Sequence, residues 1–406
     1  MKMPDSVLIV GGGLAGATAA FALRDGGFAG RVTVVGDEQS LPYERPPLSK
    51  GYLRNEEPFE KFRVRPLGDY ESAGIDLVRG RRAVTLDAHA RRVTLDDGWQ
   101  IGFDALLLAT GSRSRHLGAT SAYLPGVHYL RTLEDADGLR AAAETATAIV
   151  VIGGGWIGSE VAASLRQLGH GVTLVSNLRR PLERVLGPEI ADVYRALHEE
   201  HGVEIRHGHV AGIEGDARAE GVRLADGQVL PADLVVAGVG AVPRIELATR
   251  GGLETIEGGV KTDAHLRTSA PSIFAAGDIA AAWHPRYERH LRVEHWDNAM
   301  RQGRAAAANI MGAGDAYERI PYFYSDQFDL GMEYRGLATS WDRVVVRGDL
   351  SAREFHAFWL SGGRVVAAMN ANLWDDGEEL ERIVESGSPV DGHRLADPTV
   401  PLAEAA

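Results

Sequence analysis

Short continuous apolar runs, each followed by glycines and then by a helical pattern, organise the first two thirds of this chain. Residues 7–10 and 149–152 are such runs, and each leads through a glycine cluster into an alanine-rich segment of helical period. A further run at residues 31–35 predicts a second strand of the first unit. Continuous apolar strands are typical of parallel sheets that are covered on both faces. The pattern therefore predicts a doubly wound α/β architecture.

The two halves of this region follow the same plan. Residues 83–108 alternate as a meander with a turn at residues 96–98, and they end in an apolar strand. Residues 205–239 repeat this arrangement, with a turn at Asp226-Gly227 and a closing strand over residues 234–240. The repetition predicts two duplicated nucleotide-binding units.

The last quarter of the chain has a different pattern. Strand candidates at residues 344–347, 354–360 and 364–370 and a helix at 376–386 predict a small α+β domain, and residues from about 388 predict a loosely packed tail. The fold class is thus α/β, with two Rossmann-like domains of the glutathione reductase type and a small α+β C-terminal domain. The expected domains are residues 1–114 with 245–320, residues 115–244, and residues 321–406.

The glycine clusters are two copies of the GxGxxG fingerprint of dinucleotide-binding turns. They comprise Gly11, Gly13 and Gly16 around Leu14 and Ala15, and Gly153, Gly155 and Gly158 around Trp156 and Ile157. The first glycine permits a tight turn, the second lets the backbone approach a pyrophosphate, and the third lets the helix pack on the strand. Two such sites suggest two cofactors.

Asp37 ends the second strand, about twenty residues after the first fingerprint, where an acid holds an adenosine ribose. We interpret it as the ribose ligand, with a solvated acid in a turn as the alternative. Residues 41–50 are a proline-stiffened stretch with a predicted helix start at Ser49. Lys50 is one of four lysines among 43 basic residues, so it is a candidate for a chemical role, and chance is the alternative.

Composition excludes several classes of function. The chain has 406 residues, of which 45% are hydrophobic and 24% charged, as expected for a globular protein of two or three domains. Zero cysteines exclude thiolate catalysis, a redox disulfide and a cysteine-held cluster. The net charge of −13 argues against nucleic acid or an anionic membrane as partner. No stretch reaches the roughly 18 apolar residues of a membrane helix, and the first strand starts too early for a signal peptide, so we expect a cytoplasmic protein.

Three further motifs complete the picture, namely Ala109-Thr110-Gly111, residues 238–243 (GVGAVP) and residues 268–278 (TSAPSIFAAGD). With the fingerprints and the Pro46-Pro47-Leu48-Ser49-Lys50 run, the chain resembles the FAD-dependent NAD(P)H:ferredoxin reductases of bacterial oxygenase systems. The resemblance covers nearly the whole chain. It implies an enzyme that passes electrons from NAD(P)H through FAD, one at a time, to a small iron–sulfur ferredoxin. That ferredoxin would feed a haem-thiolate monooxygenase or a Rieske dioxygenase.

The resemblance also implies roles for individual residues. Lys50 would approach the flavin nitrogen that receives the hydride, and Glu160 would lie near the nicotinamide, within ion-pair reach of Lys50. Both are the catalytic candidates, in a supporting electrostatic sense. The implied FAD ligands are Gly11, Gly13, Leu14, Ala15, Gly16, Asp37, Lys50, Ala83, Ala109, Thr110, Gly111, Arg131, Gly277, Asp278 and Trp296. The implied NAD(P)H ligands are Gly153, Gly155, Trp156, Ile157, Gly158, Glu160, Ser176, Asn177 and Gly240. No metal site is expected.

The chain departs from the family pattern at two places. Relatives that prefer NADH usually place an acid where Ser176 and Asn177 follow the strand at residues 172–175, and here Arg179 and Arg180 come next. These residues can accept a 2′-phosphate, which predicts use of NADPH. The alternative, in which Asn177 binds a plain ribose and the arginines are solvated, stays open. Tyr324 stands where relatives often carry tryptophan.

Because ferredoxins are usually acidic, Arg65, Arg301 and Arg304 are candidates for a docking face, with plain solvated surface as the alternative. A monomer or weak homodimer is expected. One competing function is a cysteine-free FAD-dependent reductase of a quinone or of monodehydroascorbate. An NAD(P)H oxidase or peroxidase of this scaffold would need a cysteine beside the flavin. A DNA-binding flavoprotein similar to apoptosis-inducing factor would need a basic surface.

Overall fold

The structure is a computed structural model, which describes residues 3–118 and 120–405. The chain forms two compact units. Unit 1 comprises Met1–Pro46, Pro58–Arg113 and Ala241–Arg319, and unit 2 comprises Pro47–Glu57, Ser114–Gly240 and Ile320–Ala406. The division into three domains stays a prediction.

Unit 1 is built on a five-stranded parallel sheet. Its strand order is β20 (Ile273–Ala275), β7 (Ala105–Leu108), β1 (Ser6–Val10), β2 (Arg31–Val35) and β3 (Ile75–Val78). Successive residues of β1 face opposite sides of the sheet, and both sides are covered. Val7 and Ile9 pack with α1 (Leu14–Asp25) and α7 (Trp296–Ile310), whereas Leu8 and Val10 belong to the cluster on the other side. This double burial explains the continuous apolar run.

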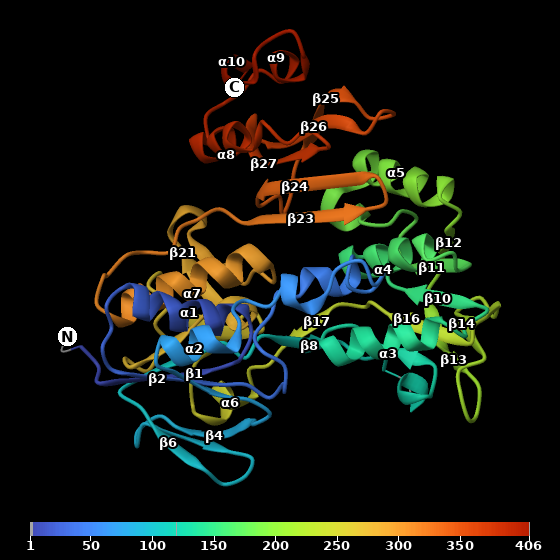
Figure 1. Cartoon of the computed structure of the whole chain (residues 1–406). Coiled ribbons are helices and arrows are strands. Elements are labelled where there is room, and N and C mark those ends of the chain that lie inside the picture. Colours follow the sequence, from blue (N-terminus) through green and yellow to red (C-terminus); the bar gives the residue numbers. More distant parts are fainter. Residues whose placement is uncertain (1–2, 119, 406) are drawn as a thin grey trace. The chain divides into compact units, whose positions relative to one another are not determined.

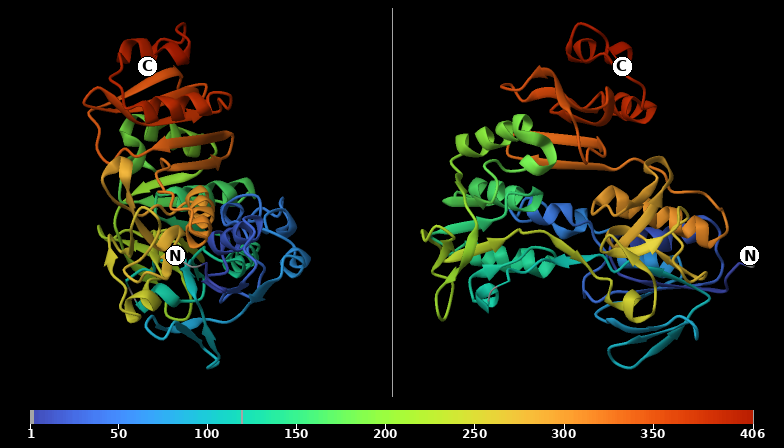
Figure 2. Two further views of the ribbon diagram at one scale, coloured as in Figure 1. Left: turned by 90° about the vertical axis from the view of Figure 1, so that its left-hand side faces the viewer. Right: turned by 180° about the vertical axis from the view of Figure 1, so that it is seen from behind.

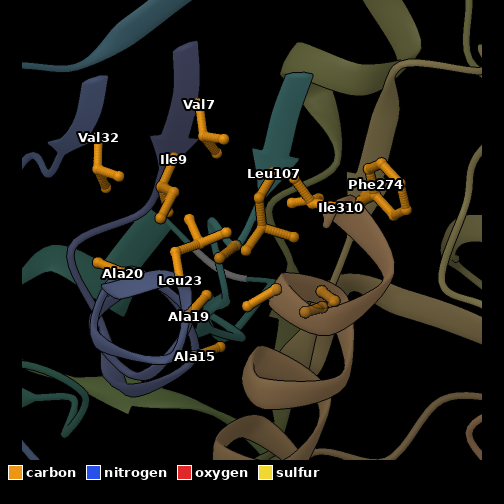
Figure 3. Packing of buried hydrophobic residues seen from close by; sticks show 14 of the residues in the cluster. Val7, Ile9, Ala15, Ala19, Ala20, Leu23, Val32, Leu107, Phe274 and Ile310 are labelled. Atoms are coloured by element: carbon orange, nitrogen blue, oxygen red, sulfur yellow. The ribbon is translucent and has the colours of Figure 1, made fainter. Parts of the chain in front are cut away.

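Small residues bring helix and sheet close together in unit 1. Ala19 and Ala20 of α1 lie toward the sheet, Ala15 lies on the side of α7, and Ile310 of α7 lies beside Phe274 (Figure 3). A Cβ atom on Gly303 of α7 would stand 2.4 Å from the carbonyl oxygen of Ala15, so the two helices touch at their backbones. The N-terminal turn of α1 is therefore held next to α7.

The remaining elements of unit 1 surround this sheet (Figure 1). They include a meander, a four-stranded sheet, a short two-stranded ladder and two small helices. These are β4 (Ala83–Asp87), β5 (Arg92–Leu95) and β6 (Gln100–Gly102); β18 (Thr255–Ile256), β19 (Gly259–Thr262), β21 (Ala280–His284) and β22 (Arg289–Leu291); β8 (Ser112–Ser114) with β17 (Ala241–Pro243); and α2 (Leu67–Ser72) and α6 (Glu246–Arg250).

Unit 2 repeats the plan of unit 1, which confirms the predicted duplication. Its parallel sheet has the order β12 (Glu204–His207), β11 (Val172–Ser176), β10 (Ile149–Ile152), β16 (Leu234–Ala237) and β9 (Val127–His128). Helices α3 (Leu133–Ala143) and α4 (Trp156–Gln167) pack on one side. The meander of β13 (Val210–Glu214), β14 (Gly221–Leu224) and β15 (Val229–Pro231) packs on the other. The closing strand is shorter than predicted, because it ends at Ala237 before the glycines.

The C-terminal part of unit 2 is an antiparallel sheet. Its order is β23 (Tyr322–Gln327), β24 (Leu330–Gly336), β27 (Arg364–Ala371), β26 (Glu354–Ser361) and β25 (Arg343–Asp349). The last three strands and α8 (Gly377–Ser386) confirm the predicted elements. Strands β23 and β24 were not predicted. In β23 the buried alternate positions are polar, Ser325 and Gln327, so the strand lacks the usual apolar period.

The prediction of a loosely packed tail is wrong. Two short helices, α9 (Gly392–Ala396) and α10 (Leu402–Ala405), follow α8 at the red end of the chain (Figure 2). Leu395 and Leu402 of these helices are buried. The guanidinium of Arg347 donates hydrogen bonds of 2.6 Å to the carbonyl oxygens of Asp397 and of Val400. Backbone acceptors and apolar anchors spaced along the segment hold the tail on β25, and the sequence pattern did not reveal them.

The predicted helix start at Ser49 is also wrong. A 3-10 helix covers Pro46–Ser49, and the backbone N–H of Lys50 donates to the carbonyl of Pro47 at 3.0 Å. A helix starting at Ser49 would use its hydroxyl as a cap. Here the hydroxyl donates to Glu160 instead. Within residues 3–118 and 120–405, no helix combines the length and apolar character needed to cross a lipid bilayer.

Candidate functional site

Most of the predicted residues of unit 1 lie at one edge of its sheet. Strands β1, β2, β7 and β20 are parallel, so their carboxyl ends share an edge. Each of these ends leads into predicted residues, which are respectively Gly11, Asp37, Ala109 to Gly111, and Gly277 with Asp278. The chain leaves β1 toward β2 on one side, while β7 lies on the other. Ligands of open α/β sheets bind at such a switch point.

Close backbone approach explains the first glycine of the fingerprint in unit 1. Gly11 has a φ of +129°, and a Cβ atom there would stand 2.0 Å from the carbonyl oxygen of Ala109. A Cβ atom on Gly277 would stand 3.2 Å from the Cβ of Ala15. The structure therefore brings Gly11, Ala15, Ala109 and Gly277 together.

The N-terminus of α1 is suited to a pyrophosphate. Gly13 precedes the helix, no side chain caps it, and its first turn holds no acid. Unpaired N–H groups and the helix dipole favour an anion at this end. A Cβ atom on Gly13 would meet no described atom within 4 Å, so the turn leaves an open approach. These residues fit the diphosphate of FAD.

The second fingerprint has the same geometry in unit 2. A Cβ atom on Gly153 would stand 2.3 Å from the carbonyl oxygen of Gly238, which follows β16 as Ala109 follows β7. A Cβ atom on Gly158 would stand 1.9 Å from the carbonyl oxygen of Gly153. Gly155 precedes α4, whose first turn also lacks a cap and an acid. Trp156 and Ile157 begin this helix. Gly240, two residues after Gly238, has a φ of +107°. This turn fits a second dinucleotide.

The end of β11 carries the residues predicted to select the nucleotide. Ser176 is buried, and its Oγ accepts a hydrogen bond from the N–H of Leu178, whereas Asn177 is exposed. Arg180 pairs with Asp192 at 2.5 Å and with Glu183 at 3.6 Å. Arg179 is exposed and makes no ion pair or hydrogen bond with a described residue. Arg179 is therefore available to a ligand.

Lys50 and Glu160 form a buried ion pair in unit 2. Nζ of Lys50 lies 2.7 Å from Oε2 of Glu160, and the two side chains are only 13% and 4% exposed. The Ser49 hydroxyl donates to the same oxygen at 2.5 Å, and the Ser325 hydroxyl donates to Oε1 at 2.7 Å. The ring of Tyr324 lies 5.6 Å from Nζ of Lys50. Neither charge is left uncompensated.

Packing of residues 47–57 on α4 positions this pair. Leu53 is fully buried with Val161 and Leu165 of the helix. Ser164 of α4 donates a hydrogen bond of 2.6 Å to the carbonyl oxygen of Ser49. Two contacts on either side of Lys50 thus fix its backbone against the helix that carries Glu160.

The other predicted residues have various surroundings. Asp37 pairs with Arg244 at 2.5 Å, and Ala83 begins β4. In unit 1, Asp278 is buried and Trp296 is the first residue of α7. Arg131 precedes α3 in unit 2, where its N–H donates to Asp135, so it belongs to a different unit from Asp37 and Asp278.

The three docking candidates all lie in unit 1. Arg65 and Arg304 are exposed, and Arg301 pairs with Asp297 at 2.9 Å.

Several polar residues of this site were missed by sequence reasoning. Ser49 and Ser325 bind Glu160, and Gln327 and His198 continue the contacts away from it. The sequence signal was the polar pair Ser325 and Gln327 at alternate positions, in a segment singled out only for Tyr324.

His198 supplies a pH-dependent part of the stability. Burial lowers its pKa to about 4, against an ordinary 6.5 in the unfolded chain. Between these two pH values the unfolded chain therefore binds more protons than the folded protein. The contribution of His198 to the free energy of unfolding is fully present above pH 6.5 and is lost as the pH falls toward 4. We expect a loss of about 3 kcal/mol. Urea denaturation of the parent and of His198→Gln measures it, and equal pH dependence of both would contradict the assignment.

Comparison with known proteins gives concordant results. The pyridine nucleotide-disulphide oxidoreductase family matches residues 5–303, and the reductase C-terminal family matches residues 322–406. Putidaredoxin reductase CamA of Pseudomonas putida is 39% identical over 411 residues, covering 100% of this chain and 97% of the relative.

Two solved structures are similar along their whole length. A ferredoxin reductase for the CYP199A2 system from Rhodopseudomonas palustris has a TM-score of 0.95 at 37% identity, covering 99% of this chain and 100% of the other. The structure of a covalent putidaredoxin reductase–putidaredoxin complex has a TM-score of 0.94 at 39% identity, covering 99% of this chain and 98% of that chain.

Proposed function

Because this chain belongs to the pyridine nucleotide-disulphide oxidoreductase family, we propose that its two fingerprint turns bind the two cofactors of one electron-transfer reaction. The protein is an FAD-dependent ferredoxin reductase, which passes electrons from NAD(P)H through FAD to an iron–sulfur ferredoxin. The observation that carries the proposal is the pair of matching helix N-termini, each preceded by an open glycine turn.

We assign FAD to the turn in unit 1 and NAD(P)H to the turn in unit 2. When bound, FAD accepts a hydride and releases electrons singly. Gly13 and the N–H groups of α1 would hold its diphosphate, and Asp37, released from Arg244, would hold the ribose. Gly155 and the N-terminus of α4 would hold the nicotinamide dinucleotide in the same way.

The ion pair of Lys50 and Glu160 supplies orientation and charge. Hydride transfer depends on positioning and needs no acid–base residue. Glu160 holds the Lys50 ammonium in place, and Lys50 would supply a fixed positive charge to the flavin when it is bound. Such a preorganised charge acts strongly in a site with little water.

Cytochrome c reduction tests the function. The purified flavoprotein is assayed with NADH and with NADPH, with and without a two-iron ferredoxin. Strong dependence on ferredoxin is the expected result. Fast turnover with quinone or oxygen and indifference to several ferredoxins would instead favour the small-acceptor reductase.

Docking of the ferredoxin is proposed on the arginines of unit 1. Arg65 and Arg304 are exposed, and an acidic partner is attracted to exposed cations. The net charge of −13 makes such a local patch necessary. The oligomeric state, a monomer or weak homodimer, and the cytoplasmic location remain predictions.

Arg179 is proposed to bind the 2′-phosphate of NADPH. We expect Arg179→Ala to raise KM for NADPH about tenfold and to leave KM for NADH unchanged, because only NADPH carries the phosphate. Ser176→Glu should favour NADH by repelling the phosphate. Arg195→Ala, at an exposed arginine of α5 (Glu183–Glu200), is the control. Equal effects of Arg179→Ala on both nucleotides would contradict the proposal.

A further inference from the structure

We propose that Ser325, Gln327 and His198 form a hydrogen-bond relay that positions the Glu160 carboxylate, and through it the Lys50 ammonium, for hydride transfer. The relay lies entirely in unit 2. Its members are positioning residues, since they act through Glu160. The inference rests on the role proposed above for Lys50 and Glu160.

The first step is the donor set of Glu160. Ser49 and Lys50 both donate to Oε2, whereas Ser325 is the donor that reaches Oε1 among the described residues. A carboxylate taken out of water needs donors at each oxygen. With Oε1 held by Ser325, the carboxylate cannot rotate about the Cγ–Cδ bond of Glu160 without losing the hydrogen bond from Ser325. Ser325 therefore fixes the orientation in which Oε2 meets Lys50.

The second step is the direction of the Ser325 hydroxyl. A serine has one O–H to donate and can rotate it. The side-chain Nε2 of Gln327 donates to Ser325 Oγ at 3.2 Å, which occupies a lone pair of that oxygen. The proton of Ser325 is thereby left for Glu160. A reversed amide would present Oε1 to Ser325 and would compete for the proton.

The third step is the orientation of the Gln327 amide. Nε2 of His198 lies 2.8 Å from Oε1 of Gln327, and this oxygen can only accept. His198 is fully buried on α5, and its ring stands edge-on to Phe328. Burial lowers the pKa of His198, so the neutral ring carries one N–H, and the tautomer with that proton on Nε2 donates to Oε1 of Gln327. His198 thus selects the amide orientation that directs the serine.

The relay is mounted on a rigid element. Ser325 pairs with Met332 of β24 in the strand register, and Met332 is buried in the cluster that packs against α5. The neighbouring residue of β23, Tyr324, places its ring near Nζ of Lys50. One strand therefore contacts both members of the ion pair, which favours a fixed geometry.

The experiment compares Ser325→Ala with Ser325→Thr in FAD-loaded protein. Stopped-flow reduction of the flavin by NAD(P)H is expected to slow about tenfold in Ser325→Ala, because a hydrogen bond to a charged group is lost. Nucleotide affinity should stay unchanged, and the threonine hydroxyl should restore the rate. The midpoint potential of the bound flavin is measured on the same samples. We expect it to shift in Ser325→Ala and to keep the parent value in Ser325→Thr.

Gln327→Glu tests the direction of the relay at nearly constant volume. A carboxylate accepts from both His198 and Ser325, so it diverts the serine proton from Glu160. We expect the same slowing as in Ser325→Ala. Asn370→Ala is the matched control, because Asn370 is a fully buried amide in the same unit that binds Arg335 and not Glu160. It should lower stability and leave flavin reduction unchanged.

A second readout uses the FAD-free protein. Shifts of the urea midpoint are compared for Ser325→Ala, Glu160→Gln and the double variant. A relay that acts on Glu160 predicts a combined shift smaller than the sum of the two. If Ser325→Ala does not accumulate as folded protein, Gln327→Glu with Glu160→Gln carries the same test.

The outcomes separate the relay from the proposed function. If Glu160→Gln slows flavin reduction while Ser325→Ala and Gln327→Glu do not, the relay is wrong and the role of Glu160 stands. If Glu160→Gln and Lys50→Met both leave flavin reduction unchanged, the role of the ion pair fails, and the relay fails with it.

Discussion

Lys50→Met is expected to slow flavin reduction by NAD(P)H about a hundredfold, because it removes a preorganised charge from a nearly dry site. It should also lower the free energy of unfolding by about 3 kcal/mol. Both effects follow from the surroundings of Glu160, whose side chain is 4% exposed. Without Lys50, the hydrogen bonds that the described residues donate to this carboxylate come from the hydroxyls of Ser49 and Ser325. Stopped-flow absorbance and urea denaturation measure the two effects.

The partner variants separate charge from packing. Lys50→Met with Glu160→Gln replaces both charges by neutral side chains of similar size, and we expect it to recover most of the stability and little of the rate. Lys50→Arg keeps the positive charge but places it on a planar guanidinium, which fits the pocket differently from an ammonium. Its rate of flavin reduction should therefore lie between those of the parent and of Lys50→Met. Unchanged flavin spectrum, reduction rate and turnover in Lys50→Met would show that Lys50 has no role in the reaction.

Sequence pattern was sufficient for the scaffold because the scaffold depends on local rules. Residues 31–35 and 149–152 were predicted as strands with the bounds that the structure has. Glycine spacing located both turns, since the spacing reflects backbone contacts within a few residues, such as Gly158 against Gly153. The resemblance to a family then added roles that no local pattern carries.

Long-range polar contacts could not be predicted in this way. Ser325 reaches Glu160 across 165 positions of the chain, and Arg347 reaches the tail across about fifty. In both cases a polar or charged residue is buried against the usual preference, and its partner becomes apparent only in three dimensions. The missed strand β23 has the same cause, since its inward side chains serve the site and not the apolar core.

The glycine turns offer the other large expected effect. Gly13→Ala and Gly155→Ala should both fold, because their φ angles of −91° and −85° suit alanine and a Cβ atom meets nothing described within 4 Å. The new methyl group would instead occupy the space through which a pyrophosphate approaches the backbone. Gly158→Ala should be unstable, since its Cβ atom would stand 1.9 Å from a carbonyl oxygen.

The two folded variants separate the cofactors, because each affects a different turn. We expect Gly13→Ala to weaken FAD binding and Gly155→Ala to raise KM for NAD(P)H, each by about fivefold to a hundredfold, since overpacking costs about 1–3 kcal/mol. Flavin fluorescence titration and steady-state kinetics measure them. Gly138→Ala, on an exposed position of α3, should change neither and should stabilise the helix by about 0.5–1 kcal/mol. Weaker FAD binding in Gly155→Ala, with an unchanged KM for NAD(P)H, would reverse the assignment of the two turns.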